Sequence, residues 1–202
     1  RQCRSLRRKM AAGLPFLLIV VCAPSGAATR DGAESPATGS SSSRFLAPGK
    51  PMLTLEAADD MANAAVAEAK SNGYKDISVF VLNAAGGTIV SKTMLGCPPL
   101  PHKLAHAKAM LCISTHASSS RALRDKYVPD RTPQLLAMTI IGTHSQQPLA
   151  AVPGGLLCRD AAGNVVGAVG VSGASADEDE RCAAVAARAV GLVTAADEAG
   201  IT

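Results

Sequence analysis

Aromatic side chains are scarce in this chain of 202 residues, which contains no tryptophan, three phenylalanines and two tyrosines. Proteins that bind nucleic acids typically combine stacking aromatic side chains with a basic stripe. Residues 1–50 contain eight basic and two acidic side chains, whereas residues 51–202 contain twelve basic and fourteen acidic ones. The larger part of the chain lacks both features, so we do not expect nucleic acid as a partner.

Two motifs of well-defined chemistry are also missing. No GxxxxGK[ST] pattern is present, which argues against an ATP-binding P-loop. The six cysteines form no C-x-x-C pair, and dispersed cysteines in a chain rich in alanine and valine are typical of small buried hydrophobic residues. A disulfide stays open, because it depends on geometry that spacing does not give. The four cysteines after residue 50 are Cys97, Cys112, Cys158 and Cys182.

The beginning of the chain contains an apolar run that is too short to span a bilayer comfortably. This run, Leu14–Cys22, precedes the small residues Ser25 and Ala27. An apolar run followed by small residues is typical of a secretory signal. We therefore expect residues 1–28 to be a signal or leader segment, with no membrane span once this segment is removed.

A linker and one domain are expected to follow the leader. Residues 29–50 are rich in serine, glycine, alanine and proline, a composition typical of a disordered linker. Residues 51–202 have the length of one ordinary domain. The leader predicts a secreted protein or one in the endomembrane lumen. The signal followed by a serine-rich, lightly basic stretch also resembles two-part plastid targeting, which is the alternative location.

The first part of the domain has the pattern of a helix followed by a β-hairpin. Thr54 is suited to cap the helix, apolar residues recur at helical spacing after it, and Gly73 ends it. The runs "DISVFVLN" and "TIVSKTM" then flank "AAGG". We expect these runs to pair as a hairpin in which Gly86 and Gly87 supply positive φ.

The rest of the domain contains further helices and a second hairpin. Helices are expected in "LAHAKAMLCISTHA", around "SRALRDKYV" and from about Asp177 to Ala195, whereas "TPQLLAMTIIG" fits either a helix or a strand. The run "LLCRDAAGNVVGAVGVS" repeats the hairpin pattern with "DAAGN" as its turn. This order of elements predicts an α+β fold, an antiparallel β-sheet flanked by helices.

Several motifs, in the same order, resemble the GlcG/HbpS family, a haem-binding or haem-degrading domain that also forms the C-terminus of PduO-type corrinoid adenosyltransferases. They are "LTLEAADDMANAAVAEA", "ISVFVLNAAGGTIVSKTM", "AHAKA", "PGGLLCRD" and "GNVVGAVGVSGASADEDE". The resemblance covers roughly Leu53 to Val193. It implies an α/β sandwich, homo-oligomers, and association with haem, iron or, less readily, corrinoid. It implies much less about catalysis.

The resemblance also implies which residues hold the ligand. In the Pro-Gly-Gly loop, "LLCRD" stands where the family more usually has a Val-Pro-Leu/Ile-Arg pattern, which places Cys158 near the expected pocket. The middle segment "VPDRTPQLLAMTIIGTHSQQPLA" matches only weakly. The residues carried over by matching motif are Lys108, Pro153, Gly154, Gly155, Gly170, Gly173 and Asp177.

The glycines and acidic residues of these motifs fit two interpretations each. Gly154 and Gly155 fit an anion-binding nest or a tight turn after a proline. The glycines spaced by three from Gly167 to Gly173 fit close packing or the approach of a flat ligand. The acidic run Asp177 to Glu180 fits a solvated helix start or a site for a hard cation such as iron, with Asp177 as the candidate ligand.

The histidines and Lys108 are likewise open to two interpretations. His102 and His106 are four residues apart, a spacing that places two imidazoles on one helix face, although the prolines before His102 can hold it outside the helix. A neutral imidazole is able to ligate haem iron, so His106 is the first candidate for an axial ligand and His102 the second. His144 is a weaker candidate. Lys108 fits a lysine that reaches solvent or, by the resemblance, a contact with a ligand carboxylate or a subunit.

Three functions follow from this sequence. The first is a protein that binds haem, a related tetrapyrrole or iron between the sheet, a helix and a neighbouring subunit, with an accessory or haem-degrading role. The second is a small-molecule enzyme that uses Lys108 and the Pro-Gly-Gly loop to bind a carboxylated substrate. The third is an assembly module without a small ligand.

Overall fold

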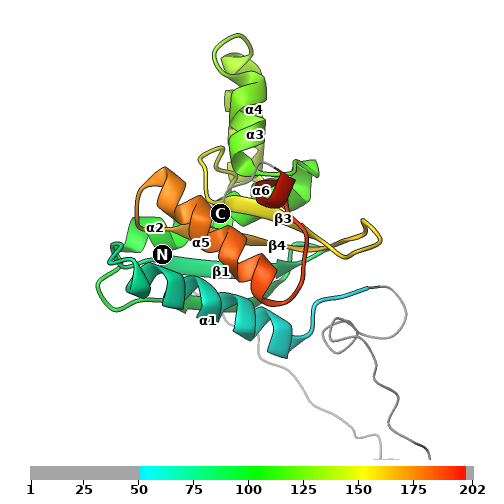
Figure 1. Cartoon of the computed structure of the whole chain (residues 1–202). Helices are drawn as coiled ribbons and strands as arrows, with labels where there is room; N and C mark the ends of the chain where they lie inside the picture. The colour runs from blue at the N-terminus through cyan, green and yellow to red at the C-terminus, as the bar shows by residue number, and fades with distance from the viewer. Residues whose placement is uncertain (1–50, 199–202) are drawn as a thin grey trace, which may run out of the picture. The chain divides into compact units, whose positions relative to one another are not determined.

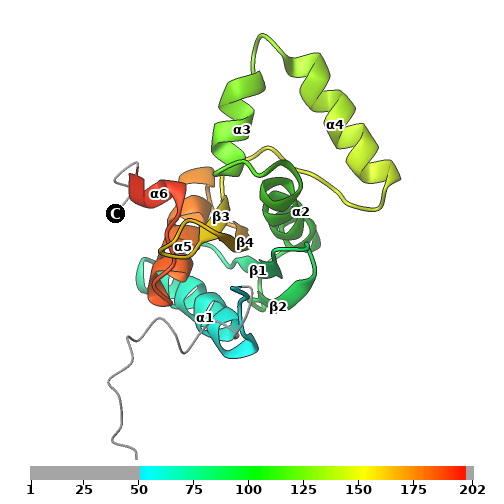
Figure 2. The same ribbon diagram turned by 90° about the vertical axis from the view of Figure 1, so that its right-hand side faces the viewer.

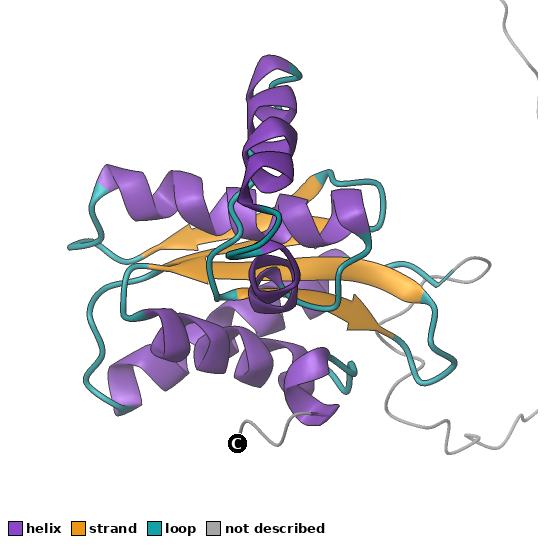
Figure 3. Ribbon diagram, turned by 90° about the horizontal axis from the view of Figure 1, so that it is seen from above, coloured by secondary structure: helices purple, strands orange, loops and turns teal. Residues whose placement is uncertain are grey.

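A computed structural model describes residues 51–198 of the chain. The leader and the linker expected in residues 1–50 lie outside the described residues. Four antiparallel strands form one sheet in the order β2-β1-β4-β3. Both predicted hairpins are confirmed, and they lie side by side because β1 pairs with β4 (Figure 3). The strands are β1 (Ser78–Asn83), β2 (Thr88–Thr93), β3 (Gly155–Arg159) and β4 (Val165–Ser172).

Helices cover both faces of this sheet. Helices α1 (Leu55–Ser71) and α5 (Ala176–Ala189) pack side by side on one face, and α2 (Pro99–Thr115) lies on the other (Figures 1 and 3). The helix faces that meet the sheet are rich in alanine, and small side chains let helices approach closely. The α+β arrangement expected from the sequence is confirmed. Within residues 51–198, no helix combines the length and the apolar character that a membrane span requires.

The ends of the helices follow local signals in the sequence. The Thr54 hydroxyl accepts a hydrogen bond from the Ala57 amide, which confirms the predicted cap of α1. At α5, Ser175 and Glu178 form a reciprocal capping box. The predicted extension of this last helix to Ala195 is wrong. Gly191 adopts a φ of 73° and ends the helical run, and the chain resumes as the short helix α6 (Ala195–Glu198).

Two further expectations need correction. Only Gly86 of the first hairpin turn has positive φ, at 85°. A side chain at Gly87 would instead meet the Asn83 amide, because that Cβ would lie 2.9 Å from Asn83 Nδ2. Helix α2 starts at Pro99, earlier than expected, so His102 lies inside it. A proline is tolerated in the first helical turn, where its missing N–H has no intrahelical partner to lose.

The segment that fits either helix or strand in the sequence is a helix. Helices α3 (Ser120–Tyr127) and α4 (Thr132–His144) follow α2 and extend away from the sheet (Figure 2). Gly142 is the one buried residue of α4, whereas Leu136, Ile140 and Ile141 are more than half exposed. Because the apolar residues of α4 are mostly exposed and do not belong to the core, their pattern in the sequence did not distinguish a helix from a strand.

Candidate functional site

Lys108 is a charged residue in the middle of the core, with 1% of its surface exposed. Its Nζ donates hydrogen bonds to Asp179 Oδ2 at 2.7 Å and to the Val171 carbonyl at 2.9 Å. Asp179 belongs to α5, which covers the opposite face of the sheet from α2, and its Oδ1 accepts a hydrogen bond from the Ala174 amide. The ion pair therefore connects the two helical layers past the end of β4. The interpretation of Lys108 as a lysine that reaches solvent is wrong.

Burial acts on both partners of this pair. It lowers the pKa of Lys108 and raises the pKa of Asp179, and the opposite charge of the partner counteracts each shift. An isolated charge in this position would be costly, because several kcal/mol are lost when an ion leaves water. Each member has a second hydrogen-bond partner in the backbone, which reduces that cost. Every buried side-chain nitrogen and oxygen in the described part of the chain has a partner.

Gly154 and Gly155 leave the space through which Lys108 reaches Asp179. A Cβ at Gly154, which has a φ of 116°, would lie 2.9 Å from Lys108 Nζ and 2.9 Å from Asp179 Cβ. A Cβ at Gly155 would lie 2.5 Å from the Lys108 carbonyl oxygen. The Gly155 amide already donates to Ser120 Oγ at 2.9 Å, so it is not free to bind an anion. Close packing around the ion pair accounts for both glycines.

A second ionic group lies next to the first one. Arg121 of α3 donates from Nε to Glu180 Oε2 at 2.6 Å and forms an ion pair with Asp177 through its NH2 group. The Glu180 side chain is 3% exposed and that of Asp177 is 85% exposed. Asp177, the candidate metal ligand, is thus held by a cation. The described residues contain no group of three or more His, Cys, Asp and Glu side chains arranged to hold a metal ion.

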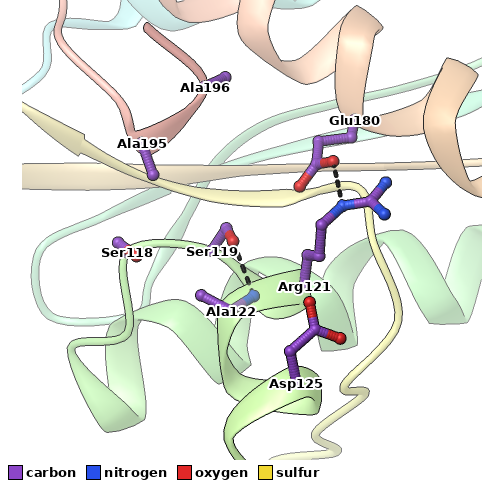
Figure 4. Close-up of a pocket in the computed structure, with 8 residues that line it drawn as sticks. All are labelled: Ser118, Ser119, Arg121, Ala122, Asp125, Glu180, Ala195 and Ala196. Carbon is purple, nitrogen blue, oxygen red and sulfur yellow. Dashed lines mark hydrogen bonds and ion pairs between the residues drawn. The ribbon is translucent and has the colours of Figure 1, made fainter. Parts of the chain in front are cut away.

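A small pocket opens beside Arg121 and Glu180 (Figure 4). Its volume is about 230 Å³, below the roughly 300–1,000 Å³ of typical ligand pockets. A tetrapyrrole does not fit into a pocket of this volume. The lining residues are Ser118, Ser119, Arg121, Ala122, Asp125, Glu180, Ala195 and Ala196.

His102 and His106 form a separate cluster, the histidine pair, on the side of α2 that faces β1 and β2. Both rings contact Phe80 of β1 edge-on, with ring centroids 4.8 Å and 5.2 Å from that of Phe80. The prediction that the two imidazoles share one helix face is therefore confirmed. His102 Nδ1 lies 2.9 Å from Thr93 Oγ1 and 3.1 Å from Ser78 Oγ. These hydroxyls fix the His102 ring and leave its Nε2 available.

His106 is only half-buried, and no described residue hydrogen-bonds its ring. Partial burial lowers the pKa of His106, and the nearby His102 lowers it further. A lowered pKa keeps the imidazole neutral at neutral pH, the form that binds iron or other metals. The chemistry of the pair therefore fits an axial ligand. Its exposed position requires another surface to cover the second face of a porphyrin.

The remaining candidates lie apart from both clusters. His144 is exposed and ends α4. Cys158 is fully buried in the core, where burial raises the pKa of its thiol to about 12. The cysteines of the described residues are free thiols. Pro153 is buried at the entry to β3.

Backbone contacts explain the spaced glycines of β4 and its end. A Cβ at Gly170 would lie 2.1 Å from the Ala105 carbonyl oxygen of α2, and one at Gly173 would lie 2.3 Å from the Asp76 carbonyl oxygen. These glycines therefore admit close neighbours from the same chain, as the packing interpretation expects.

Sequence reasoning missed Asp179 as the partner of Lys108. The signal was present, because Asp179 stands three residues before Cys182 and seven before Ala186, on the apolar stripe of its helix. Lys108 similarly stands between Ala105 and Cys112 on a stripe of buried residues. Two opposite charges on two apolar stripes are the pattern of a buried ion pair. Arg121 and Phe80 carried no comparable signal.

Comparison with known proteins gives a consistent result. A sequence model of the family described as "Haem degrading protein HbpS-like" matches residues 53–188. No match was found among the curated proteins. The solved structures that resemble the chain include the PduOC:heme complex, with 23% identity and a TM-score of 0.61 over 71% of this chain and 98% of that one.

Two structures of HbpS resemble the chain at higher identity. One is a double mutant of HbpS from Streptomyces reticuli, with 29% identity and a TM-score of 0.59 over 80% of this chain and 99% of that one. The other, a crystal structure of HbpS, has 31% identity and a TM-score of 0.57 over 72% of this chain and 94% of that one. The family match covers more than half of the chain, and its order of elements agrees with the fold. The chain belongs to the HbpS-like family, whose model is described as "Haem degrading protein HbpS-like".

Proposed function

We propose that this protein binds haem, with the histidine pair on α2 as the site of attachment. The observation that carries the proposal is the half-exposed His106 ring, which lies beside Phe80 and has no hydrogen-bond partner among the described residues. Bound haem would supply an iron that accepts an imidazole nitrogen as axial ligand. The buried Phe80 ring contacts both imidazoles and holds His102 next to that position. The family match and the structure of the PduOC:heme complex support the proposal.

The residues of the chain have separate tasks in this proposal. His106 would hold the haem iron through a ring nitrogen, and His102, oriented by Ser78 and Thr93, is the second candidate for that role. The buried pair of Lys108 and Asp179 holds α2 in place against the sheet. A contact between Lys108 and a ligand carboxylate would require the displacement of Asp179, so the structure favours binding over an enzyme built on that lysine.

A haem titration of the full chain tests this proposal. We expect a saturable shift of the Soret band in the unaltered protein. His106→Gln should weaken haem binding by about tenfold or more, since loss of even a supporting group near a metal typically costs 10–100-fold. His144→Gln is the matched control, because His144 is an exposed histidine at the end of α4. Equal haem affinities of His106→Gln and His144→Gln would contradict the assignment of His106 as the iron ligand.

We also propose that α4 mediates self-association between copies of this chain. Leu136, Ile140 and Ile141 are 58%, 57% and 66% exposed, and α4 contains no Asp, Glu, Lys or Arg. An apolar helix that residues 51–198 leave largely uncovered is typical of an interface. Sedimentation of the full chain should show an oligomer, and Ile140→Lys should shift it toward the monomer. An oligomer that this change leaves intact would contradict the role of α4.

A further inference from the structure

The spacing and exposure of the histidine pair raise a question that is independent of haem. His102 and His106 lie one helical turn apart on α2, and side chains four residues apart have Cβ atoms roughly 5–6 Å from each other. Both rings contact the same phenylalanine, Phe80, from the same side of β1. Two imidazoles are therefore held near each other by the packing of one helix against one strand.

Hydrogen bonds select which nitrogen of His102 faces outward. Its Nδ1 is 2.9 Å from Thr93 Oγ1 and 3.1 Å from Ser78 Oγ, and these hydroxyls are 2.9 Å from each other. In metal sites, the second ring nitrogen of a ligating histidine is usually fixed by such a partner, which sets the tautomer and the ring orientation. His102 thus has the supporting hydrogen bonds that a metal ligand typically has.

The other ring has no competing partner. No described residue hydrogen-bonds His106, and its neighbours on the pair's side are the ring of Phe80 and His102. The His106 ring therefore has no competing hydrogen bond and lies beside the same phenylalanine as the oriented His102 ring.

We propose that His102 and His106 bind a divalent transition-metal ion through one nitrogen each. Two imidazoles with the remaining positions open to water suit Ni²⁺, Cu²⁺ or Zn²⁺, whereas Mg²⁺ and Ca²⁺ prefer oxygen ligands. No third His, Cys, Asp or Glu among the described residues completes the group. The site is therefore a two-ligand, exchangeable site. This inference goes beyond haem binding and does not depend on it.

Calorimetric titration of the full chain with NiCl₂, under reducing conditions and near neutral pH, tests the inference. We expect His102→Gln and His106→Gln each to weaken Ni²⁺ binding by about tenfold or more. His144→Gln should bind as the unaltered protein does. The cysteines are the same in all four proteins, so binding to thiols cancels in the comparison. Equal Ni²⁺ affinities in all four proteins would overturn the inference.

A second variant tests the supporting hydrogen bonds without touching a ligand. Thr93→Val removes the hydroxyl beside His102 Nδ1 and should weaken Ni²⁺ binding, whereas Thr93→Ser retains the hydroxyl and should restore it. Equal binding by both variants would count against the orienting role of Thr93. The readout also separates this inference from the haem proposal. Normal Ni²⁺ binding together with no Soret shift on addition of haem would contradict the haem proposal alone. A Soret shift together with no Ni²⁺ binding would contradict the metal site alone.

Discussion

Two polar clusters on helix α2 lie two residues apart in the sequence and differ in almost every physical respect. The histidine pair, His102 and His106, is half-exposed beside β1 and β2 and retains unused nitrogen atoms. The Lys108–Asp179 ion pair is buried, and both members have their partners inside the chain. The comparison teaches that a residue matched to a family motif need not contact a ligand. The buried cluster maintains the fold, and the exposed pair is available for binding.

The largest effect is expected from breaking the buried ion pair. Lys108→Met should destabilise the protein by about 3–5 kcal/mol, because Asp179 is left as an unpaired buried charge. The double variant Lys108→Met with Asp179→Leu should recover a substantial part of that loss. Chemical denaturation of the unaltered protein and of these variants measures both effects. If Lys108→Met alone were as stable as the unaltered protein, the structural role of Lys108 would be contradicted.

A smaller but still large loss is expected at the glycine beside the pair. Gly154→Ala forces a side chain into a φ of 116° and to within 2.9 Å of Lys108 Nζ. Strained backbone alone typically costs about 1–3 kcal/mol. Gly163→Ala is a matched control, because Gly163 also has positive φ, at 85°, but a Cβ added there would meet no atom within 4 Å. Thermal unfolding should show the greater loss for Gly154→Ala, and equal losses would mean that close packing is unimportant.

The ionic group next to the pair should contribute less. Arg121→Met removes the partner of Glu180, whose side chain is 3% exposed, at an expected cost of about 1–3 kcal/mol. Arg124→Met is the control, because Arg124 pairs with the exposed Asp125 on the same helix. Exposed pairs are worth about 0–1 kcal/mol. Equal losses of unfolding free energy in the two variants would show that Arg121 contributes no more to stability than an exposed ion pair does.

The smallest effect concerns pH and the histidine pair. Because the pKa of His106 is lowered from its usual 6.5 in the folded protein, the unfolded chain binds more protons between the folded pKa and 6.5. The free energy of unfolding should therefore fall as the pH decreases through that window. His106→Gln should flatten this part of the stability profile. A profile that keeps its slope in the variant would assign the pH dependence to other groups.

Much of the fold could be predicted from the sequence because its signals are local. Turn glycines, the Thr54 cap and the alternation of apolar residues determine hairpins and helices from a few neighbours. The error at the end of α5 arose from the apolar Val193, which continues the helical stripe although Gly191 has already ended the helix. Val193 pairs with Arg159 instead.

The candidate site could be predicted only in part, because it depends on contacts between distant segments. The spacing of His102 and His106 showed that they share a face, since both lie on one helix. The apolar stripes around Lys108 and Asp179 indicated that each charge is buried, but no local pattern showed that these two residues, 71 apart, meet through the gap left by Gly154. The Pro-Gly-Gly motif was visible in the sequence, whereas the ion pair that it accommodates was visible only in the structure.

The most direct test of this division of roles is a haem titration that compares two variants, one for each cluster. The first is His106→Gln, and the second is the double variant Lys108→Met with Asp179→Leu, which replaces both charges by apolar side chains of similar shape. Our account predicts that the double variant shifts the Soret band with nearly the affinity of the unaltered protein, whereas His106→Gln loses at least about tenfold. Normal binding by His106→Gln together with lost binding in a folded double variant would contradict it and place the ligand at the buried cluster.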